Sequence, residues 1–241
     1  MRWARALAPL FLVGCFDFEE PDLPQAGDPA TLQAFVHLDD MGRLDFSGVL
    51  VPGLTTEGQP REVPNDTIRL YGLAVAPSEV KPDRTRIYAF TAQLAGADPT
   101  AQPLTLIAPR VTGVQADPPV LQWPGVRRLD PDSIVVPAGA EVTLRVALTP
   151  VTASPEPTSR QWNVDLLSTE GNFRLGANAV PPTEIRIPPQ WIPAAANGRV
   201  TAFLTYFQTG AFRPPPGDYV LTVSADIRVR WHLRIQTTTT P

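Results

Sequence analysis

The sequence contains few of the residues on which metal sites, disulfides and acid–base catalysis depend. It has one cysteine, two histidines and, among its 20 basic residues, a single lysine, Lys81. One cysteine excludes a disulfide within the chain and any zinc or iron–sulfur site built from several cysteines. Charged residues are only 18% of the total, and a net charge of −4 gives the whole molecule no attraction for nucleic acid. We therefore expect no metal, no nucleic-acid partner and no dissociable cofactor.

The sequence also lacks a hydrophobic run long enough to cross a bilayer as a helix, which takes about 20 residues. The apolar stretch near the start is short, from Ala6 to Val13, and it follows two positive charges, Arg2 and Arg5. A short positive segment before a short apolar core is the pattern of a secretory signal peptide. Residues 1–14 are therefore predicted to be a signal peptide.

The end of this segment, Leu12-Val13-Gly14-Cys15, resembles the lipobox of bacterial lipoproteins. The resemblance implies that Cys15 carries a covalent lipid and becomes the mature N-terminus. Each buried acyl methylene contributes about 0.8 kcal/mol, so several chains hold a protein firmly on a membrane. In many diderm bacteria an Asp after the lipidated cysteine favours the inner membrane. Because Phe16 stands there instead, the resemblance implies the outer membrane, on its periplasmic or cell-surface side, with the periplasmic face of the inner membrane as the alternative.

The residues that flank the body of the chain are unsuited to regular structure. Between Phe16 and Ala30 there are five acidic residues, three prolines and no basic residue. Such a composition favours a solvated segment, and we predict that residues 15–30 form an acidic tether with a reach of at most about 50 Å. Residues 237–241 are predicted to be a disordered tail.

Beyond residue 30 the chain shows the period of two that is typical of strands, and almost none of the helical period. Val142, Leu144 and Val146 are apolar, for example, while the residues between them are polar. The 29 prolines and 16 glycines cluster between such runs and mark turns. We predict an all-β fold, an antiparallel β-sandwich, with strands at 31–39, 43–51, 67–75, 86–94, 104–108, 120–123, 133–136, 141–149, 161–168, 183–187, 199–208 and 218–235.

The best boundary within this body is the proline-containing segment Val114–Pro119. It divides the body into an N-terminal β domain, residues 31–116, and a C-terminal sandwich, residues 117–236. The alternative is that both parts are packed sheets of one domain.

Two segments of the C-terminal part resemble bacterial immunoglobulin-like and fibronectin-III-like domains. The first is Ser133–Thr149, with a turn at Pro137–Gly139, and the second is Pro216–Val223. The resemblance implies an immunoglobulin-like sandwich, in which Tyr219 lies near the tyrosine-corner position and its hydroxyl bonds to the backbone.

The last apolar run is longer than an ordinary strand. From Tyr219 to Ile235 every second residue is apolar, with no glycine or proline between them. Such a run indicates either a hairpin near Asp226 or one strand that passes through two sheets. Its opposite face carries four cationic or titratable groups about 6.6–7 Å apart, a candidate contact for an anion or a partner protein. The alternative is a solvated face balanced by acids on the adjacent strand; the four groups are Arg228, Arg230, His232 and Arg234.

Two further features suggest weaker candidates. Trp191 lies in a proline-rich loop and is a candidate exposed aromatic contact, whereas Trp162 and Trp231 alternate with polar residues and are predicted to be core. The segment His37-Leu38-Asp39-Asp40, together with Asp45, has the residue types of a metal site. Its spacing matches no calcium loop, and a strand end with a polar turn is the better interpretation.

The chain lacks the motifs of the common enzyme classes. It has no Gly-x-Ser-x-Gly elbow, no phosphate loop and no dinucleotide fingerprint. We therefore expect a non-enzymatic, lipid-anchored envelope protein that acts as an adaptor or an accessory subunit of an envelope complex. The first alternative is a ligand- or carbohydrate-binding surface module, and the second is a hydrolase that uses two carboxylates.

Overall fold

The computed structural model describes residues 25–96, 98–114, 117–151, 154–168, 171–192, 199–215 and 217–236. The predicted signal peptide, the lipidation site Cys15 and the predicted tail lie outside these residues. Within them the regular elements are strands, apart from two single-turn 3-10 helices, η1 (Pro99–Ala101) and η2 (Pro189–Trp191). In the part of the chain described, no helix has both the length and the apolar character needed to cross a membrane. The all-β prediction is confirmed.

The strands form three sheets. The largest has nine strands: β1 (Ala30–Asp39), β2 (Arg43–Val51), β5 (Glu79–Val80), β6 (Arg86–Gln93), β10 (Ser133–Pro137), β12 (Ser159–Ser168), β13 (Gly171–Ala177), β15 (Arg199–Phe212) and β16 (Tyr219–Gln236). A second sheet has four strands: β3 (Ile68–Leu70), β4 (Leu73–Val75), β7 (Leu104–Ile107) and β8 (Val120–Trp123). The third has three strands: β9 (Val126–Arg128), β11 (Val142–Leu148) and β14 (Glu184–Ile187).

The order of the large sheet is β13-β12-β15-β16-β1-β2-β6-β5, with β10 also paired to β16. Most neighbours are antiparallel, but β16 runs parallel to both β1 and β10. The four-stranded sheet has the order β4-β3-β7-β8 and the three-stranded sheet the order β14-β11-β9.

The predicted strands agree with most of this pattern, with one division and three omissions. The single strand expected at 67–75 is a hairpin, because Tyr71 and Gly72 both adopt positive φ and form a tight turn between β3 and β4. The short strands β5 and β9 were not predicted, nor was β13. They lack a long apolar alternation, and their strand form comes from pairing with a neighbour.

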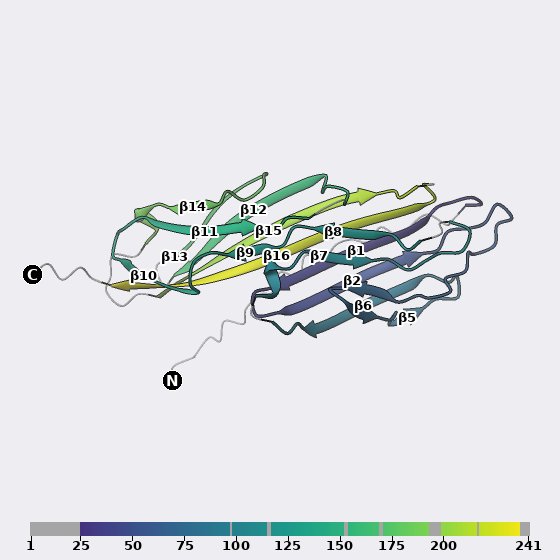
Figure 1. The fold of residues 1–241 in the computed structure, drawn as a ribbon, viewed down its shortest axis with the longest axis horizontal. Helices are drawn as coiled ribbons and strands as arrows, with labels where there is room; N and C mark the ends of the chain where they lie inside the picture. The colour runs from purple at the N-terminus through teal and green to yellow at the C-terminus, as the bar shows by residue number, and fades with distance from the viewer. Residues whose placement is uncertain are drawn as a thin grey trace, which may run out of the picture.

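Strand β16 is continuous over 18 residues, so a single strand is confirmed and a hairpin near Asp226 is wrong. The strand does not pass through two sheets, because its whole length belongs to the nine-stranded sheet. At about 3.3 Å per residue it is roughly 59 Å long, and it runs along the long axis of the molecule (Figure 1). Its first part pairs with β1 from Tyr219 to Arg228, and its last part pairs with β10 from His232 onward. The antiparallel strand β15 follows it along nearly its whole length.

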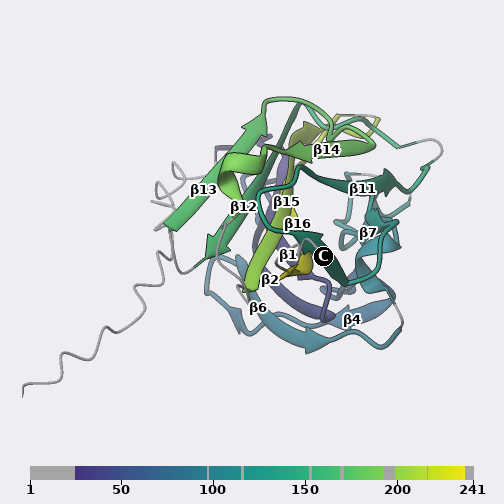
Figure 2. The same cartoon turned by 90° about the vertical axis from the view of Figure 1, so that its left-hand side faces the viewer.

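Each half of β16 covers a separate hydrophobic cluster. The two smaller sheets lie on the same side of the large sheet, each over one cluster (Figure 2). β16 contributes Tyr219–Ala225 to the cluster under the four-stranded sheet and Ile227–Ile235 to the cluster under the three-stranded sheet. The clusters do not follow the predicted division between residues 116 and 117, because Trp123 and the first half of β16 both pack with the N-terminal strands.

Where β1 leaves β16 and β10 has not yet begun, two side chains take the place of the missing strand. Asp40 Oδ2 accepts the main-chain N–H of Arg230 at 3.0 Å and lies 3.3 Å from the Arg128 guanidinium. Arg128 in turn donates to the carbonyl of Arg230. These contacts satisfy backbone groups that would otherwise be unpaired in the middle of the sheet. We call Asp40 and Arg128 the junction pair.

The expected tyrosine corner is wrong. Tyr219 is completely buried at the start of β16, and its hydroxyl has no hydrogen-bond partner among the described residues. The side chain points into the first cluster, where burial raises the pKa of Tyr219. The tyrosine that does bond to the backbone is Tyr88, whose hydroxyl donates to the carbonyl of Asp66 at 2.7 Å. The predicted turn at Pro137–Gly139 is present, and it carries the chain from the large sheet to the three-stranded sheet.

Candidate functional site

The candidate site lies on the outer face of the large sheet, the face turned away from both hydrophobic clusters. In the second half of β16 the apolar residues point inward and the four groups Arg228, Arg230, His232 and Arg234, which we call the ladder, point outward, as the alternation predicted. Arg228, His232 and Arg234 are exposed, and Arg230 is half-buried.

The register shows that no acid from β15 lies opposite this ladder, although β1 places Asp39 beside Arg228. Binding of an anion by this face stays a prediction. Thr205, Phe203 and Thr201 lie opposite Arg228, Arg230 and His232, respectively. The residue opposite Arg234 is Arg199, which is also exposed. Like charges directly opposite each other destabilise a sheet, so the Arg199–Arg234 pair lowers the stability of the protein when no anion is bound. We define the basic face as Arg199, Arg228, Arg230, His232 and Arg234.

The other neighbours of the basic face place acids near Arg228 and Arg230, but β10 contributes none. β10 places Ser133 and Val135 beside the end of the ladder. In β1 the residue next to Arg228 is Asp39, but its Oδ1 accepts the main-chain N–H groups of Met41 and Arg43 at 3.0 and 2.9 Å. Among the described residues no carboxylate oxygen forms an ion pair with Arg228.

Arg228 instead lies over an aromatic ring. Its guanidinium carbon is 6.0 Å from the centre of the Phe203 ring, at the outer limit of a cation–π contact. The acid on the β12 side of the hollow is Asp165, and it is already paired with Arg174. It accepts two hydrogen bonds from Arg174, at 2.6 and 3.1 Å, and one from the Asn163 amide at 3.0 Å.

These side chains surround a shallow hollow of about 480 Å³ across four strands of the large sheet. A volume of this size is within the range of about 300–1,000 Å³ common for ligand sites. Phe203 and Leu167 give the hollow apolar surface, and Leu167 is 43% exposed. The polar groups come from β12, β13 and β16; the full lining is Asp165, Leu167, Asn172, Phe173, Arg174, Phe203 and Arg228.

The segment considered for a metal forms a polar network instead. His37 and Asp39 share the outer face of β1, but the His37 ring pairs with Asp226 of β16, with Nδ1 2.6 Å from Oδ1. Asp45 accepts from Arg43 Nε at 2.9 Å and from the Thr91 hydroxyl at 2.8 Å. In the ranges described there is no group of three or more His, Cys, Asp or Glu arranged to hold a metal.

Trp191 is only partly exposed. Its ring stacks on Phe173, with centres 5.7 Å apart and an interplanar angle of 11°, and it packs against the second hydrophobic cluster. It is therefore not a free aromatic platform, and its role as a contact stays a prediction. Trp162 and Trp231 are both buried in the same cluster, as predicted.

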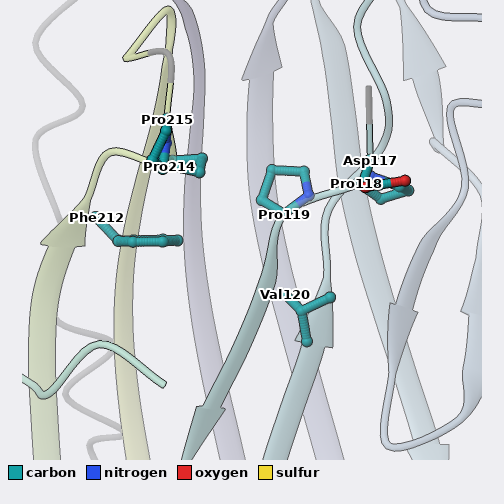
Figure 3. Close-up of a pocket in the computed structure, with 7 residues that line it drawn as sticks. All are labelled: Asp117, Pro118, Pro119, Val120, Phe212, Pro214 and Pro215. Atoms are coloured by element: carbon teal, nitrogen blue, oxygen red, sulfur yellow. The ribbon is translucent and has the colours of Figure 1, made fainter. Parts of the chain in front are cut away.

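A second hollow, of about 280 Å³, lies where β15 ends and β8 begins. Figure 3 shows Phe212 extending toward Pro119, with Pro214 and Pro215 beside it. Proline has no N–H to donate, and the one charged residue in the lining is Asp117. This hollow lacks the converging polar groups that fix a ligand, so the basic face is the better candidate.

No protein-family model matches the sequence, and no curated protein matches it. Solved structures similar to this chain include fibronectin(III)-like modules of Clostridium thermocellum CbhA, with 11% identity over 91% of this chain and 95% of that chain and a TM-score of 0.24. Trypsin-activated alpha-2-macroglobulin from Escherichia coli is matched over 87% of this chain and 16% of its own, at 11% identity and a TM-score of 0.24. A Ca²⁺-stabilised adhesin of an Antarctic bacterium is matched over 89% of this chain and 50% of its own, at 12% identity and a TM-score of 0.22. TM-scores this low assign the chain to no family.

Proposed function

We propose that this protein is a non-enzymatic, lipid-anchored component of the bacterial cell envelope that acts as an adaptor, holding an anionic partner on its basic face. The observation that carries the proposal is the register of β15 and β16, which places no acid opposite the ladder and adds Arg199 to it. A protein with a net charge of −4 thus concentrates five basic side chains on one face. Such a face attracts an anionic partner at distance and orients it on contact.

The position of the basic face relative to the proposed anchor supports an adaptor. β1 begins at Ala30, beside Tyr219 at the start of β16. Arg228 and Arg234 lie nine and fifteen residues farther along β16, or about 30 and 50 Å. If Cys15 carries the lipid, the anchor is attached to the end of the folded part that lies opposite to Arg234. The anchor then confines the protein to a membrane, while the basic face is presented away from the point of attachment.

Photocrosslinking in cells tests this function. Lys81 is the only lysine, so amine-reactive crosslinkers have a single site. A photoreactive amino acid at Thr201, within the basic face, is expected to form an adduct with an envelope component. Replacing Arg199, Arg228 and Arg234 together by serine should abolish that adduct while the protein stays in the membrane fraction, and Cys15→Ala should release it from that fraction.

The matched control places the same photoreactive residue at Thr143, a partly exposed position of the three-stranded sheet. An adduct of equal yield from Thr143, or one that survives the triple arginine change, contradicts the proposal. Membrane attachment that persists after Cys15→Ala contradicts the anchor.

The second candidate function, a ligand- or carbohydrate-binding module, is favoured by the hollow beside Arg228. The hollow lies on the same outer face of the large sheet as the basic face. The adaptor would hold an anionic partner there, whereas the module would hold a small ligand or a carbohydrate.

A further inference from the structure

We infer that the hollow on the outer face of β12, β13, β15 and β16 binds an acidic saccharide, a chain of sugar rings that carry carboxylates. The inference rests on the proposed function, because it names the chemistry of the anionic partner held on the basic face. It is argued from three properties of the hollow: a cation that forms no ion pair among the described residues, an apolar wall, and an amide group at the edge.

The cation is Arg228. Its guanidinium has no carboxylate partner among the described residues, and the contact with Phe203 restrains it at the rim of the hollow. A planar guanidinium binds a carboxylate with two parallel hydrogen bonds. Asp165 is already paired with another cation, since it accepts two hydrogen bonds from Arg174 and a third from Asn163. The Arg228 side chain is therefore free to take a carboxylate from a ligand.

The apolar wall of the hollow favours a saccharide over a simple polyanion as the ligand. Phe203 is half-buried in the middle of β15, and Leu167 is 43% exposed in β12. An aromatic ring and an aliphatic side chain offer contact to the C–H face of a sugar ring, which an inorganic anion lacks. Asn172 is exposed at the edge strand β13, and its amide supplies both a donor and an acceptor for ring hydroxyls.

The shape of the site favours a polymer that lies flat. The hollow is open and crosses four strands, and the ladder continues from it along β16 to His232 and Arg234. An acidic peptide would gain its main-chain hydrogen bonds at a free sheet edge rather than on a face whose backbone is already paired. A chain of acidic sugars needs no such pairing, and its successive carboxylates meet successive cations of the ladder.

Binding of the full chain in neutral detergent to immobilised polygalacturonate and alginate tests the inference. Wild type is expected to bind both. Arg228→Gln and Phe203→Leu should each weaken binding about tenfold or more, since one removes the guanidinium and the other the ring. Phe203→Leu keeps most of the apolar volume, and circular dichroism with urea unfolding checks its fold. Arg127→Gln, an exposed arginine of the three-stranded sheet, is the matched control and should bind like wild type.

Two further probes separate charge from sugar recognition. Fully methyl-esterified polygalacturonate keeps the rings and loses the charge, and it should not bind. Polyglutamate keeps the carboxylates and lacks the rings, and it should bind at least tenfold more weakly than polygalacturonate. Equal binding of polyglutamate, or no binding of either acidic saccharide, overturns the inference. If the Thr201 adduct persists in cells while saccharide binding fails, only this inference is lost. If that adduct is absent or survives the triple arginine change, the proposed function fails as well.

Discussion

Replacing Asp40 by alanine is expected to lower the free energy of unfolding by about 2–4 kcal/mol. The carboxylate is the acceptor for the Arg230 N–H and the partner of Arg128 at the one place where β16 lacks a neighbour on that side. Alanine leaves the Arg230 N–H without an acceptor, and the half-buried Arg128 guanidinium without a counter-charge is the larger part of the cost. Urea unfolding followed by tryptophan fluorescence measures the change.

Asp39→Ala is the matched control for this prediction. Asp39 is adjacent, and its carboxylate caps the turn between β1 and β2 through exposed main-chain N–H groups. Its loss should cost about 1 kcal/mol or less, because water replaces the lost bonds. An Asp40→Ala protein as stable as Asp39→Ala would show that the junction pair does not hold the two halves of the sheet together.

The Asp40 carboxylate should also make the free energy of unfolding depend on pH. Burial raises the pKa of Asp40 above its ordinary value of 3.8, because desolvation outweighs the hydrogen bond and charge of Arg230 and the charge of Arg128. The folded state therefore holds this proton more tightly than the unfolded state. The contribution of Asp40 to the free energy of unfolding falls as pH rises from about 3.8 through the folded pKa. Relative to Asp40→Asn, which cannot titrate, wild type should lose stability over that interval.

Trp231→Ala is expected to cost about 3–5 kcal/mol, the usual loss for an aromatic truncated in a packed core. Trp231 is completely buried, lies opposite Ala202 and contributes to the cluster under the three-stranded sheet. Its indole N–H has no hydrogen-bond partner among the described residues. Trp231→Phe should therefore cost much less than alanine, since it keeps most of the volume and removes an unpaired donor.

Trp191→Ala provides the comparison, because Trp191 is partly exposed and stacks on Phe173 at the border of the same cluster. We expect a loss of about 1–2 kcal/mol, measured by the same urea unfolding. Similar losses for the two tryptophans would contradict the assignment of Trp231 to the centre of the cluster.

The alternation along β16 predicted both its buried face and its ladder, because a strand with one face in a core repeats every two residues. The same rule placed Trp162 and Trp231 in the core. It did not locate β9 or β13, whose short, weakly patterned sequences become strands through pairing with β11 and β12. Local pattern fixes which residues point inward but not which strand lies beside them.

The parts of the candidate site that were missed depend on that pairing. Arg199 joined the basic face because the β15–β16 register places it opposite Arg234, 35 positions away in the chain. Asp40 and Arg128 are 88 positions apart, and no local pattern links them. The tyrosine corner was also wrong because it depends on the neighbouring elements. The resemblance correctly placed Tyr219 at the start of a strand, but its hydroxyl faces the first hydrophobic cluster and not the backbone. A register computed across strands would have revealed Arg199.

The most direct test of the basic face is retention of the purified protein on a sulfonate cation exchanger at about pH 7.5 and low salt. A protein with a pI near 5.2 should pass through unless positive charge is concentrated in one place. We expect wild type to be retained and eluted by salt, and the variant with serine at Arg199, Arg228 and Arg234 to flow through. The control variant, with serine at the exposed Arg69, Arg127 and Arg186 on the two smaller sheets, carries the same net charge and should still be retained. Wild type in the flow-through, or equal retention of the two variants, would contradict the basic face as a binding surface.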